Sequence, residues 1–221
     1  MSGWVKLGVL VCGVCLMASM VSAGEEGTTV LFDGKNLDAW TQKATGGWTI
    51  DADGALAWQK GCGYIWTKEQ FANFVLDLDF KVAKKTNSGI FIRTAKTGDP
   101  VQTGIEIQVL DSAGAKPEKH ICGAVYDVLA PTENPMKPAD EWNHMTITCD
   151  DNVIKVVLNG TQMIDMDLNK WTDAGLNPDG SKNKFKTAYK DMPRKGFIGF
   201  QDHGGAVWYK NVTVKVLPEK K

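Results

Sequence analysis

Residues 74–82 read FVLDLDFKV, and their pattern indicates the fold class. Apolar residues alternate with charged ones along it, so that Leu76 and Phe80 fall on one side and Asp77 and Asp79 on the other. Successive side chains of a β-strand point to opposite faces, and this alternation is therefore typical of a strand. The segment predicts a half-buried strand with one face in an apolar core and the other in solvent.

The same period-two pattern recurs through most of the chain. Asp53-Gly54 and Asn159-Gly160 each stand between two such runs, and both pairs suit the positive backbone angles of a tight hairpin turn. Only residues 68–73 indicate a short helical or turn-like segment, and no long amphipathic helix is evident. The sequence therefore predicts an all-β fold, an antiparallel two-sheet jelly-roll sandwich. Its further predicted strands are residues 47–50, 55–59, 88–94, 104–110, 142–149, 153–158, 162–166, 196–201 and 206–216.

The first residues are typical of an export signal. Lys6 precedes an apolar run at residues 7–20, and small residues lead up to Ala23, as signal peptidase requires. The run is too short to span a membrane. We expect a signal peptide at residues 1–23, a single domain at residues 24–221, and a protein that is periplasmic or secreted.

Charge and cysteine content narrow the function classes. The chain has 25 Lys and Arg against 26 Asp and Glu, so it has no basic field that would attract nucleic acid. Three cysteines follow the expected signal peptide, Cys62, Cys122 and Cys149, without the spacing of a zinc site. Two interpretations stay open for them: one disulfide with a free thiol, or three buried thiols.

Residues 169–195 interrupt the strand pattern. The segment is polar and rich in turn residues, and it becomes basic towards its end. Long irregular loops inside compact domains are uncommon and often functional. We expect a lid or rim over one end of the sandwich, from which Lys184 or Arg194 could reach a substrate oxygen.

Two of the predicted strands carry a candidate binding face. In GIEIQVLD, Glu106 and Gln108 share one face, and in NSGIFIR, Phe91 and Arg93 share one face. If these strands pair, Arg93 can approach Glu106. Either the two form an ordinary ion pair on a solvated sheet, or they belong to a hollow face that binds a polyol, with aromatic rings stacked on the sugar.

The spacing of the acidic groups argues against ordinary glycosidase chemistry. A retaining glycosidase needs two carboxyl groups about 5 Å apart on one face. Glu106 and Asp111 are separated by an odd number of positions and are expected on opposite faces.

His203, before Gly204-Gly205 at a strand end, could transfer protons at neutral pH, or it could be a turn residue bonded to backbone. No paired-histidine spacing indicates a transition-metal site, although Glu106, Asp111 and His203 could converge on an ion.

A set of motifs resembles one known family. From about residue 29 to 217 the chain is similar to the 3-keto-disaccharide hydrolase family, through LFDGKNLDAW, NSGIFIRT, GIEIQVLD, GAVYDVLAP, EWNHMTI, VVLNG and NKFKTAYKDMPRKGFIGFQDHGGAVWYKNV. The resemblance implies a concanavalin-like, laminarinase-like jelly roll in exported proteins that act on glycosides whose sugar carries a ketone at C3. The polar positions that match the family are Arg93, Glu106, Gln108, Asp111, Tyr126, Lys184, Asp202 and His203.

The implied substrate suggests a mechanism that needs only one base. A ketone at C3 acidifies the hydrogen at C2, so that a base can remove it and the enolate can expel the glycosidic oxygen at C1, with water adding later. The hypothesis assigns the base to His203 or Glu106, enolate stabilisation to Arg93 or a divalent cation held by Glu106, leaving-group assistance to Tyr126 or Asp111, and substrate binding to Arg93, Gln108, Lys184 and Asp202. The alternative function is a carbohydrate-binding module without catalysis.

Overall fold

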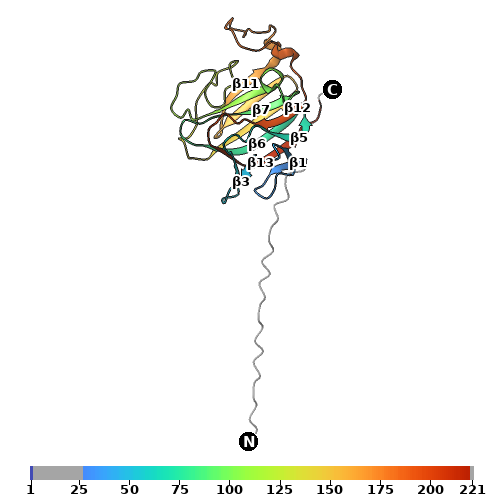
Figure 1. The fold of residues 1–221 in the computed structure, drawn as a ribbon. Coiled ribbons are helices and arrows are strands. Elements are labelled where there is room, and N and C mark those ends of the chain that lie inside the picture. The colour runs from blue at the N-terminus through green and yellow to red at the C-terminus, as the bar shows by residue number, and fades with distance from the viewer. Residues whose placement is uncertain (2–26, 220–221) are drawn as a thin grey trace.

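The chain folds into two antiparallel β-sheets packed face to face, as seen in a computed structural model that describes Met1 and residues 27–219 (Figure 1). Apart from Met1, the expected signal peptide lies outside the described residues. No helix among those described is long and apolar enough to cross a membrane.

The first sheet, sheet A, has eight strands. In spatial order they are β11 (Thr161–Asp167), β10 (Val153–Leu158), β9 (Asn143–Asp150), β6 (Phe74–Val82), β13 (Val207–Val216), β4 (Leu56–Ala57) and β3 (Thr49–Ile50), with β1 (Thr28–Phe32) also paired to β13.

The second sheet, sheet B, has five strands. Their order is β2 (Trp40–Thr41), β5 (Ile65–Phe71), β12 (Gly196–Phe200), β7 (Asn87–Thr94) and β8 (Ile105–Leu110). The helical elements are short: α1 (Pro100–Thr103), η1 (Leu168–Lys170) and η2 (Tyr189–Asp191).

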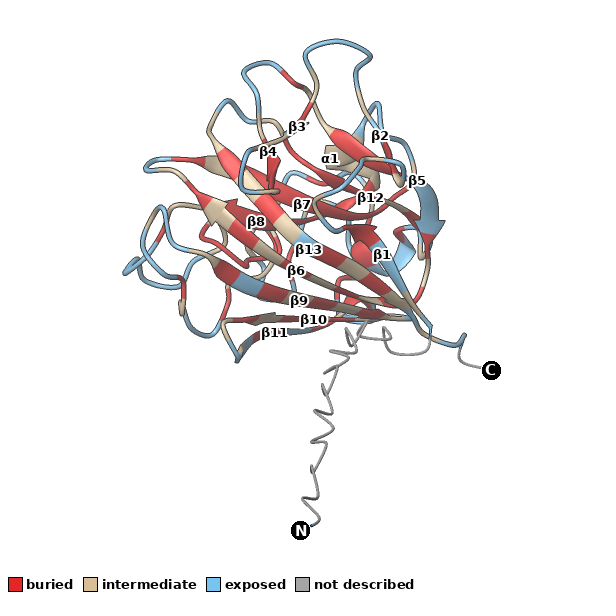
Figure 2. Ribbon diagram, turned by 90° about the horizontal axis from the view of Figure 1, so that it is seen from below, coloured by how far each residue is buried: buried red, intermediate tan, exposed pale blue. Residues whose placement is uncertain are grey.

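Strand β6, which contains residues 74–82, has the burial pattern that its alternating sequence predicts. Along β6, buried and partly buried residues alternate without a break, and the side chains of Leu76, Leu78 and Phe80 have no exposed surface. β6 pairs with β9 on one side and β13 on the other, at the centre of sheet A. The predicted fold class, an antiparallel two-sheet jelly-roll sandwich, is confirmed (Figure 2).

One local prediction is wrong. Residues 68–73 were expected to be helical or turn-like, but most of them continue β5, which lies between β2 and β12 in sheet B. The polar run from Lys68 to Gln70 is exposed, and the register against β12 shifts there. Gln70 and Phe71 pair with β12, and the amide of Lys68 donates to the carbonyl of Ala39 at 2.8 Å. These backbone contacts outweigh the weak strand propensity of the segment. The pattern also missed the short β1 and β2.

The core between the sheets is apolar and contains all three described cysteines. Phe200 of sheet B stacks on Tyr209 of sheet A, with ring centroids 3.9 Å apart. Cys62, Cys122 and Cys149 are free and buried, so the three-thiol interpretation is correct and the disulfide alternative is not. Burial raises the pKa of Cys122 and of Cys149 to about 12, which keeps both thiols protonated and unreactive.

The irregular segment 169–195 is packed onto the sandwich as a rim (orange in Figure 1). Trp171, Phe185 and Tyr189 are buried and anchor it. Arg194 does not reach outwards to a substrate, as had been considered, because its guanidinium donates to backbone carbonyls within the rim, those of Tyr189, Lys190 and Met192.

Candidate active site

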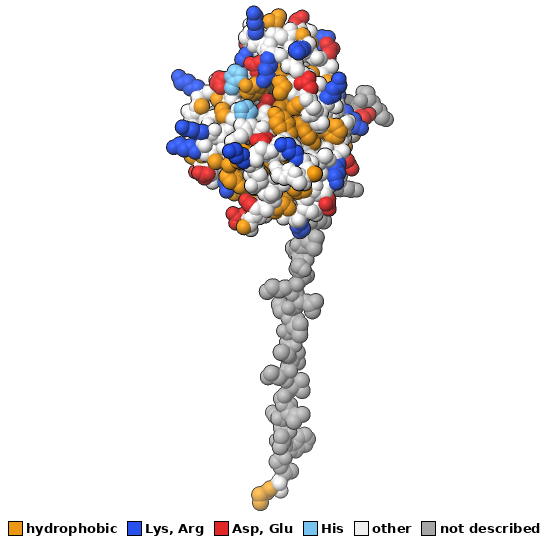
Figure 3. Space-filling view, in the orientation of Figure 1, with side chains coloured by type: hydrophobic (Ala, Val, Ile, Leu, Met, Phe, Trp, Pro, Cys, Tyr) orange, Lys and Arg blue, Asp and Glu red, His pale blue; other side chains and the backbone are white. Residues whose placement is uncertain are grey.

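The outer face of sheet B, here called the open face, has an aromatic floor. Tyr64, just before β5, stacks on Phe91 of β7, with centroids 5.8 Å apart and an interplanar angle of 29°. Trp66 of β5 lies against both, at 5.7 Å from Tyr64 and 6.0 Å from Phe91. In Figure 3, hydrophobic side chains form a patch on the visible face, in the region where Figure 1 labels β5, β7 and β12.

Two glycines allow large side chains to lie flat on this face. A Cβ atom at residue 199 would overlap the six-membered ring of Trp66, and one at residue 89 would overlap Oε1 of Glu106. Glycine in a strand interior often marks such a close approach. Gly89 and Gly199 are therefore part of the construction of the open face.

Glu106 is the central ionisable group of the open face. It points outwards from β8, opposite Phe91, yet only 7% of its surface is exposed. Burial raises its pKa to about 7, although Lys184 and a hydrogen bond with Gln201 act in the opposite direction. A carboxylate with a pKa near the ambient pH is suited to accept a proton and release it again.

Two glutamines flank Glu106 and retain hydrogen-bonding capacity. Gln201 donates to the hydroxyl of Tyr64 at 3.2 Å, and Gln108 donates to the carbonyl of His120 at 3.2 Å. The Oε1 atoms of Gln108 and Gln201 are buried, and neither has a partner among the described residues. Unpaired buried acceptors are uncommon, and these two could accept from hydroxyl groups of a bound ligand after a small side-chain rotation.

Tyr126 and Lys184 complete the charged end of the open face. The amide of Tyr126 donates to the carbonyl of Glu106 at 3.0 Å, so residues 123–126 run beside β8. The ammonium of Lys184 lies 4.1 Å from the centre of the Tyr126 ring. Burial and the charge of Glu106 raise the pKa of Tyr126, which therefore stays protonated at neutral pH. The structure thus brings together four of the residues considered from sequence, Glu106, Gln108, Tyr126 and Lys184.

Arg93 is not part of this group, and its expected approach to Glu106 is wrong. Its backbone has a φ of 50°, which breaks the alternation of β7. Only 1% of the residue is exposed. Its guanidinium donates to three acceptors at one end of the sandwich: Ala72 O at 2.9 Å, Asp151 O at 2.6 Å and Asn73 Oδ1 at 3.2 Å.

Asp111 also has a structural role, in the turn that precedes β7. Its Oδ2 accepts from the amide of Lys85 at 2.8 Å, and its own amide donates to Thr86 O at 2.9 Å. Asp111 therefore holds the turn between β6 and β7, where Lys85 has a φ of 62°. Among the residues that the structure describes, no three His, Cys, Asp or Glu side chains are arranged to hold a metal ion, so the considered convergence of Glu106, Asp111 and His203 is not formed.

In the Asp202-His203 pair, Asp202 is held by hydrogen bonds, whereas His203 is exposed. The carboxylate of Asp202 accepts from the indole of Trp58 at 2.6 Å and from the amides of Gly63 and Gly204 at 2.9 and 3.0 Å. Burial alone would raise the pKa of Asp202, but these hydrogen bonds outweigh it, and the pKa is lowered. Asp202 thus ties the turn to the segment before β5. His203 is exposed in a bend, and its ring has no hydrogen-bond partner among the described residues.

Sequence reasoning missed the contribution of Tyr64 and Gln201. Both could have been found from strand parity, because Tyr64 alternates with Trp66, and Gln201 continues the alternation of Phe197 and Gly199.

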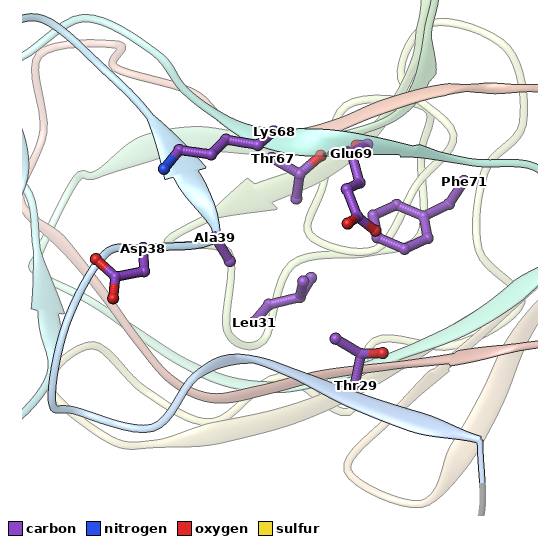
Figure 4. Close-up of a pocket in the computed structure, with 8 residues that line it drawn as sticks. All are labelled: Thr29, Leu31, Asp38, Ala39, Thr67, Lys68, Glu69 and Phe71. Carbon is purple, nitrogen blue, oxygen red and sulfur yellow. Dashed lines mark hydrogen bonds between the residues drawn. The ribbon is translucent and has the colours of Figure 1, made fainter.

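Two hollows lie on sheet B or at its edge. A cavity of about 150 Å³ lies where β1 and the segment before β2 meet β5, with Leu31 and Phe71 in its lining (Figure 4). Its charged side chains, those of Asp38, Lys68 and Glu69, lie at an exposed edge. A hollow of about 530 Å³ instead adjoins Tyr64 and Trp66 on the open face. The open face is the better candidate because Glu106, with its raised pKa, is there.

Comparisons with known proteins agree on one family. Residues 27–215 match the family model described as a 3-keto-alpha-glucoside-1,2-lyase-like domain. A protein of Bacteroides thetaiotaomicron named 3-keto-disaccharide hydrolase is 28% identical over 229 aligned residues, which cover 87% of this chain and 79% of the relative.

Solved structures extend the comparison. A Parabacteroides distasonis protein, provisionally described as a glycosyl hydrolase, is 37% identical with a TM-score of 0.78, over 86% of this chain and 99% of that one. A β-glucanase of Bacillus licheniformis, 10% identical with a TM-score of 0.50 over 88% of this chain and 100% of that one, shares the fold alone. From the match over residues 27–215, the chain belongs to the family of 3-keto-alpha-glucoside-1,2-lyase-like domains.

Proposed function

We propose that this protein is an enzyme that cleaves glycosides whose sugar carries a ketone at C3, with Glu106 as the base that removes the proton at C2. The observation that carries the proposal is the buried carboxylate of Glu106, whose pKa is raised to about 7 on the open face. The names of the family and of its Bacteroides relative support the substrate class. Their use of both "lyase" and "hydrolase" fits a reaction that begins with elimination.

The first step is an elimination assisted by three side chains. Glu106 takes the proton from C2, and the electrons of that bond form an enolate with the C3 ketone. The ammonium of Lys184, which acts electrostatically on Glu106, would stabilise the enolate. The enolate then forms the C1–C2 double bond as the bond from C1 to the glycosidic oxygen breaks, and the leaving oxygen takes a proton from Tyr126.

The second step is the addition of water. Tyr126, now a phenolate, takes a proton from a water molecule, and the hydroxide so formed adds at C1. Glu106 exchanges its proton with solvent and then returns a proton to C2, so that the product is the free 3-keto sugar and no net oxidation occurs. This sequence requires one carboxylate with a pKa near neutrality, in contrast to the carboxylate pair of ordinary glycosidases. His203, exposed in the bend that follows β12, is assigned to contacts with the substrate.

We propose further that the protein is exported, to the periplasm or the outside of the cell. The support is the sequence of residues 1–23, with its lysine, apolar run and small residues before Ala23. N-terminal sequencing of the protein from its natural host should begin at Gly24. Recovery of an intact Met1 terminus from that host would contradict export by cleavage.

The reaction is tested by two parallel incubations of the purified protein. One contains a 3-keto-disaccharide, and the other the parent disaccharide with a hydroxyl at C3. The proposal expects release of free sugar from the first alone, because only the ketone acidifies the C2 hydrogen. Binding of the 3-keto-disaccharide without release would favour the alternative, a non-catalytic carbohydrate-binding module, for which the aromatic floor would also be suited.

A further inference from the structure

Two hollows adjoin the aromatic floor, and Glu106 is not among the lining residues of either. The hollow of about 530 Å³ is lined by residues that include Tyr64, Trp66, Thr97 and Val101. A second hollow of about 290 Å³ shares Trp66 and Thr97 with it and includes Phe197. These five residues, Tyr64, Trp66, Thr97, Val101 and Phe197, are called the Trp66 groove.

Polar and apolar groups are segregated between the two ends of the open face. At one end, Glu106, Gln108, Gln201 and Lys184 offer a charge and hydrogen-bonding groups. The Trp66 groove instead offers the rings of Trp66 on β5 and of Tyr64 just before β5, together with the side chains of Val101 and Phe197.

The charged residues that border the groove add little to its interior. Lys43 donates its ammonium to the carbonyl of Gly61 at 2.8 Å, and both Asp99 and Lys68 are exposed. A second sugar in the groove would therefore find few fixed partners for its hydroxyl groups, and unpaired polar groups are costly in a desolvated contact.

We propose that the Trp66 groove binds the leaving group of the substrate and that this leaving group is a planar aromatic aglycone, as in an aryl glycoside. The inference rests on the proposed function for the identity of the sugar end. An aryl ring can lie against Trp66 and Tyr64 in stacked or edge-on contact, and it buries apolar surface without leaving hydroxyl groups unpaired. On cleavage, the aryl oxygen takes the proton and departs as a phenol.

The variant Val101→Asn tests the groove. Val101 is half-buried on α1, and asparagine is similar in size, so the change places an amide where the aryl ring would lie. We expect kcat/KM for phenyl 3-keto-glucoside, divided by kcat/KM for methyl 3-keto-glucoside, to fall about tenfold in the variant. The intrinsic difference between phenol and methanol as leaving groups cancels when this ratio is compared with that of the unaltered protein.

The matched control is Val216→Asn, a change at a valine that is 57% exposed on β13. It should leave the ratio as it is in the unaltered protein. An unchanged ratio in Val101→Asn, or an equal loss with both substrates, would overturn the aryl assignment. Circular dichroism of both variants checks that the fold is retained.

A binding measurement separates this inference from the proposed reaction. Phenyl glucoside and methyl glucoside, both without the ketone, are titrated calorimetrically into the protein and into Val101→Asn. Suppose that neither 3-keto substrate is turned over, but phenyl glucoside binds more tightly than methyl glucoside and loses this advantage in the variant. The groove assignment is then supported and the proposed reaction is contradicted. If phenyl glucoside has no advantage over methyl glucoside, the groove assignment fails regardless of turnover.

Discussion

Arg93 and Glu106 show how two charged residues on neighbouring strands acquire opposite roles. The guanidinium of Arg93 is buried with three acceptors, so its charge is spread over hydrogen bonds that join chain segments distant in sequence. Glu106 is also buried, but among the described residues no guanidinium is paired with it, and burial raises its pKa. A buried carboxyl group that keeps a proton near neutral pH is a reactive group, whereas a fully bonded guanidinium is a structural one.

The variant Arg93→Met is expected to lose stability. It leaves the carbonyls of Ala72 and Asp151 without their donors, and the free energy of unfolding should fall by about 2–4 kcal/mol. Urea unfolding followed by tryptophan fluorescence measures this change. The partly exposed Arg194→Met serves as the comparison and should lose no more than about 1 kcal/mol. A variant Arg93→Met that keeps its stability but has a raised KM would instead indicate that Arg93 binds substrate.

At the scale of the strand, alternation predicts which residues share a face until the backbone departs from regular geometry. It correctly places Glu106 and Gln108 on the opposite face from Ile105, Ile107 and Val109, which pack in the apolar core. It fails at Arg93, where a positive φ turns the side chain away and the register against β12 shifts. Hairpin chemistry was also predictable, because Asn159 and Gly160 adopt φ values of 49° and 85° between β10 and β11.

Gly89 on β7 leaves the space that the carboxylate of Glu106 occupies, and a substitution there tests whether the position of Glu106 matters for catalysis. In Gly89→Ala, the new Cβ would overlap the carboxylate of Glu106, which must move away from the sheet. Because misplacement of a reacting group by about 1 Å can cost about 10²-fold in rate, kcat should fall by about that factor. Steady-state kinetics on a 3-keto-glucoside measure it, with circular dichroism as the control for folding. Full activity in Gly89→Ala would mean that the position of Glu106 is not important.

At the scale of the whole molecule, the sequence predicts the sandwich better than the site. The core depends on many alternating residues whose effects add, so single departures such as β5 leave the fold class unchanged. The site depends on a few contacts between distant segments, such as Lys184 over Tyr126 and Gln201 on Tyr64. Neither parity nor turn chemistry specifies how the rim 169–195 packs, and those contacts therefore required the structure.

The raised pKa of Glu106 also predicts a cost to the stability of the whole fold. The folded-state pKa is about 7 and the ordinary value is 4.5, so the folded protein binds the proton more tightly than the unfolded chain. Stability that is present below pH 4.5 is therefore lost as the pH rises to about 7. This loss is at most about 3 kcal/mol, at 1.36 kcal/mol per pKa unit.

The variant Glu106→Gln should remove this cost. Its Tm should match that of the unaltered protein near pH 4.5 and exceed it at pH 8, as measured by calorimetry at both pH values. A Tm difference that is the same at both would show that the carboxyl group is not held in its neutral form by the fold.

Removal of the C2 proton by Glu106 can be followed by cleaving a 3-keto-disaccharide in D₂O and measuring deuterium at C2 of the released 3-keto sugar. This proton transfer predicts one deuterium at C2 beyond the spontaneous exchange of the free 3-keto sugar. It also predicts that Glu106→Gln loses cleavage and deuterium incorporation together, by about 10²- to 10⁴-fold, while the exposed Glu133→Gln retains both. Cleavage that leaves hydrogen at C2, or undiminished incorporation in Glu106→Gln, would contradict it.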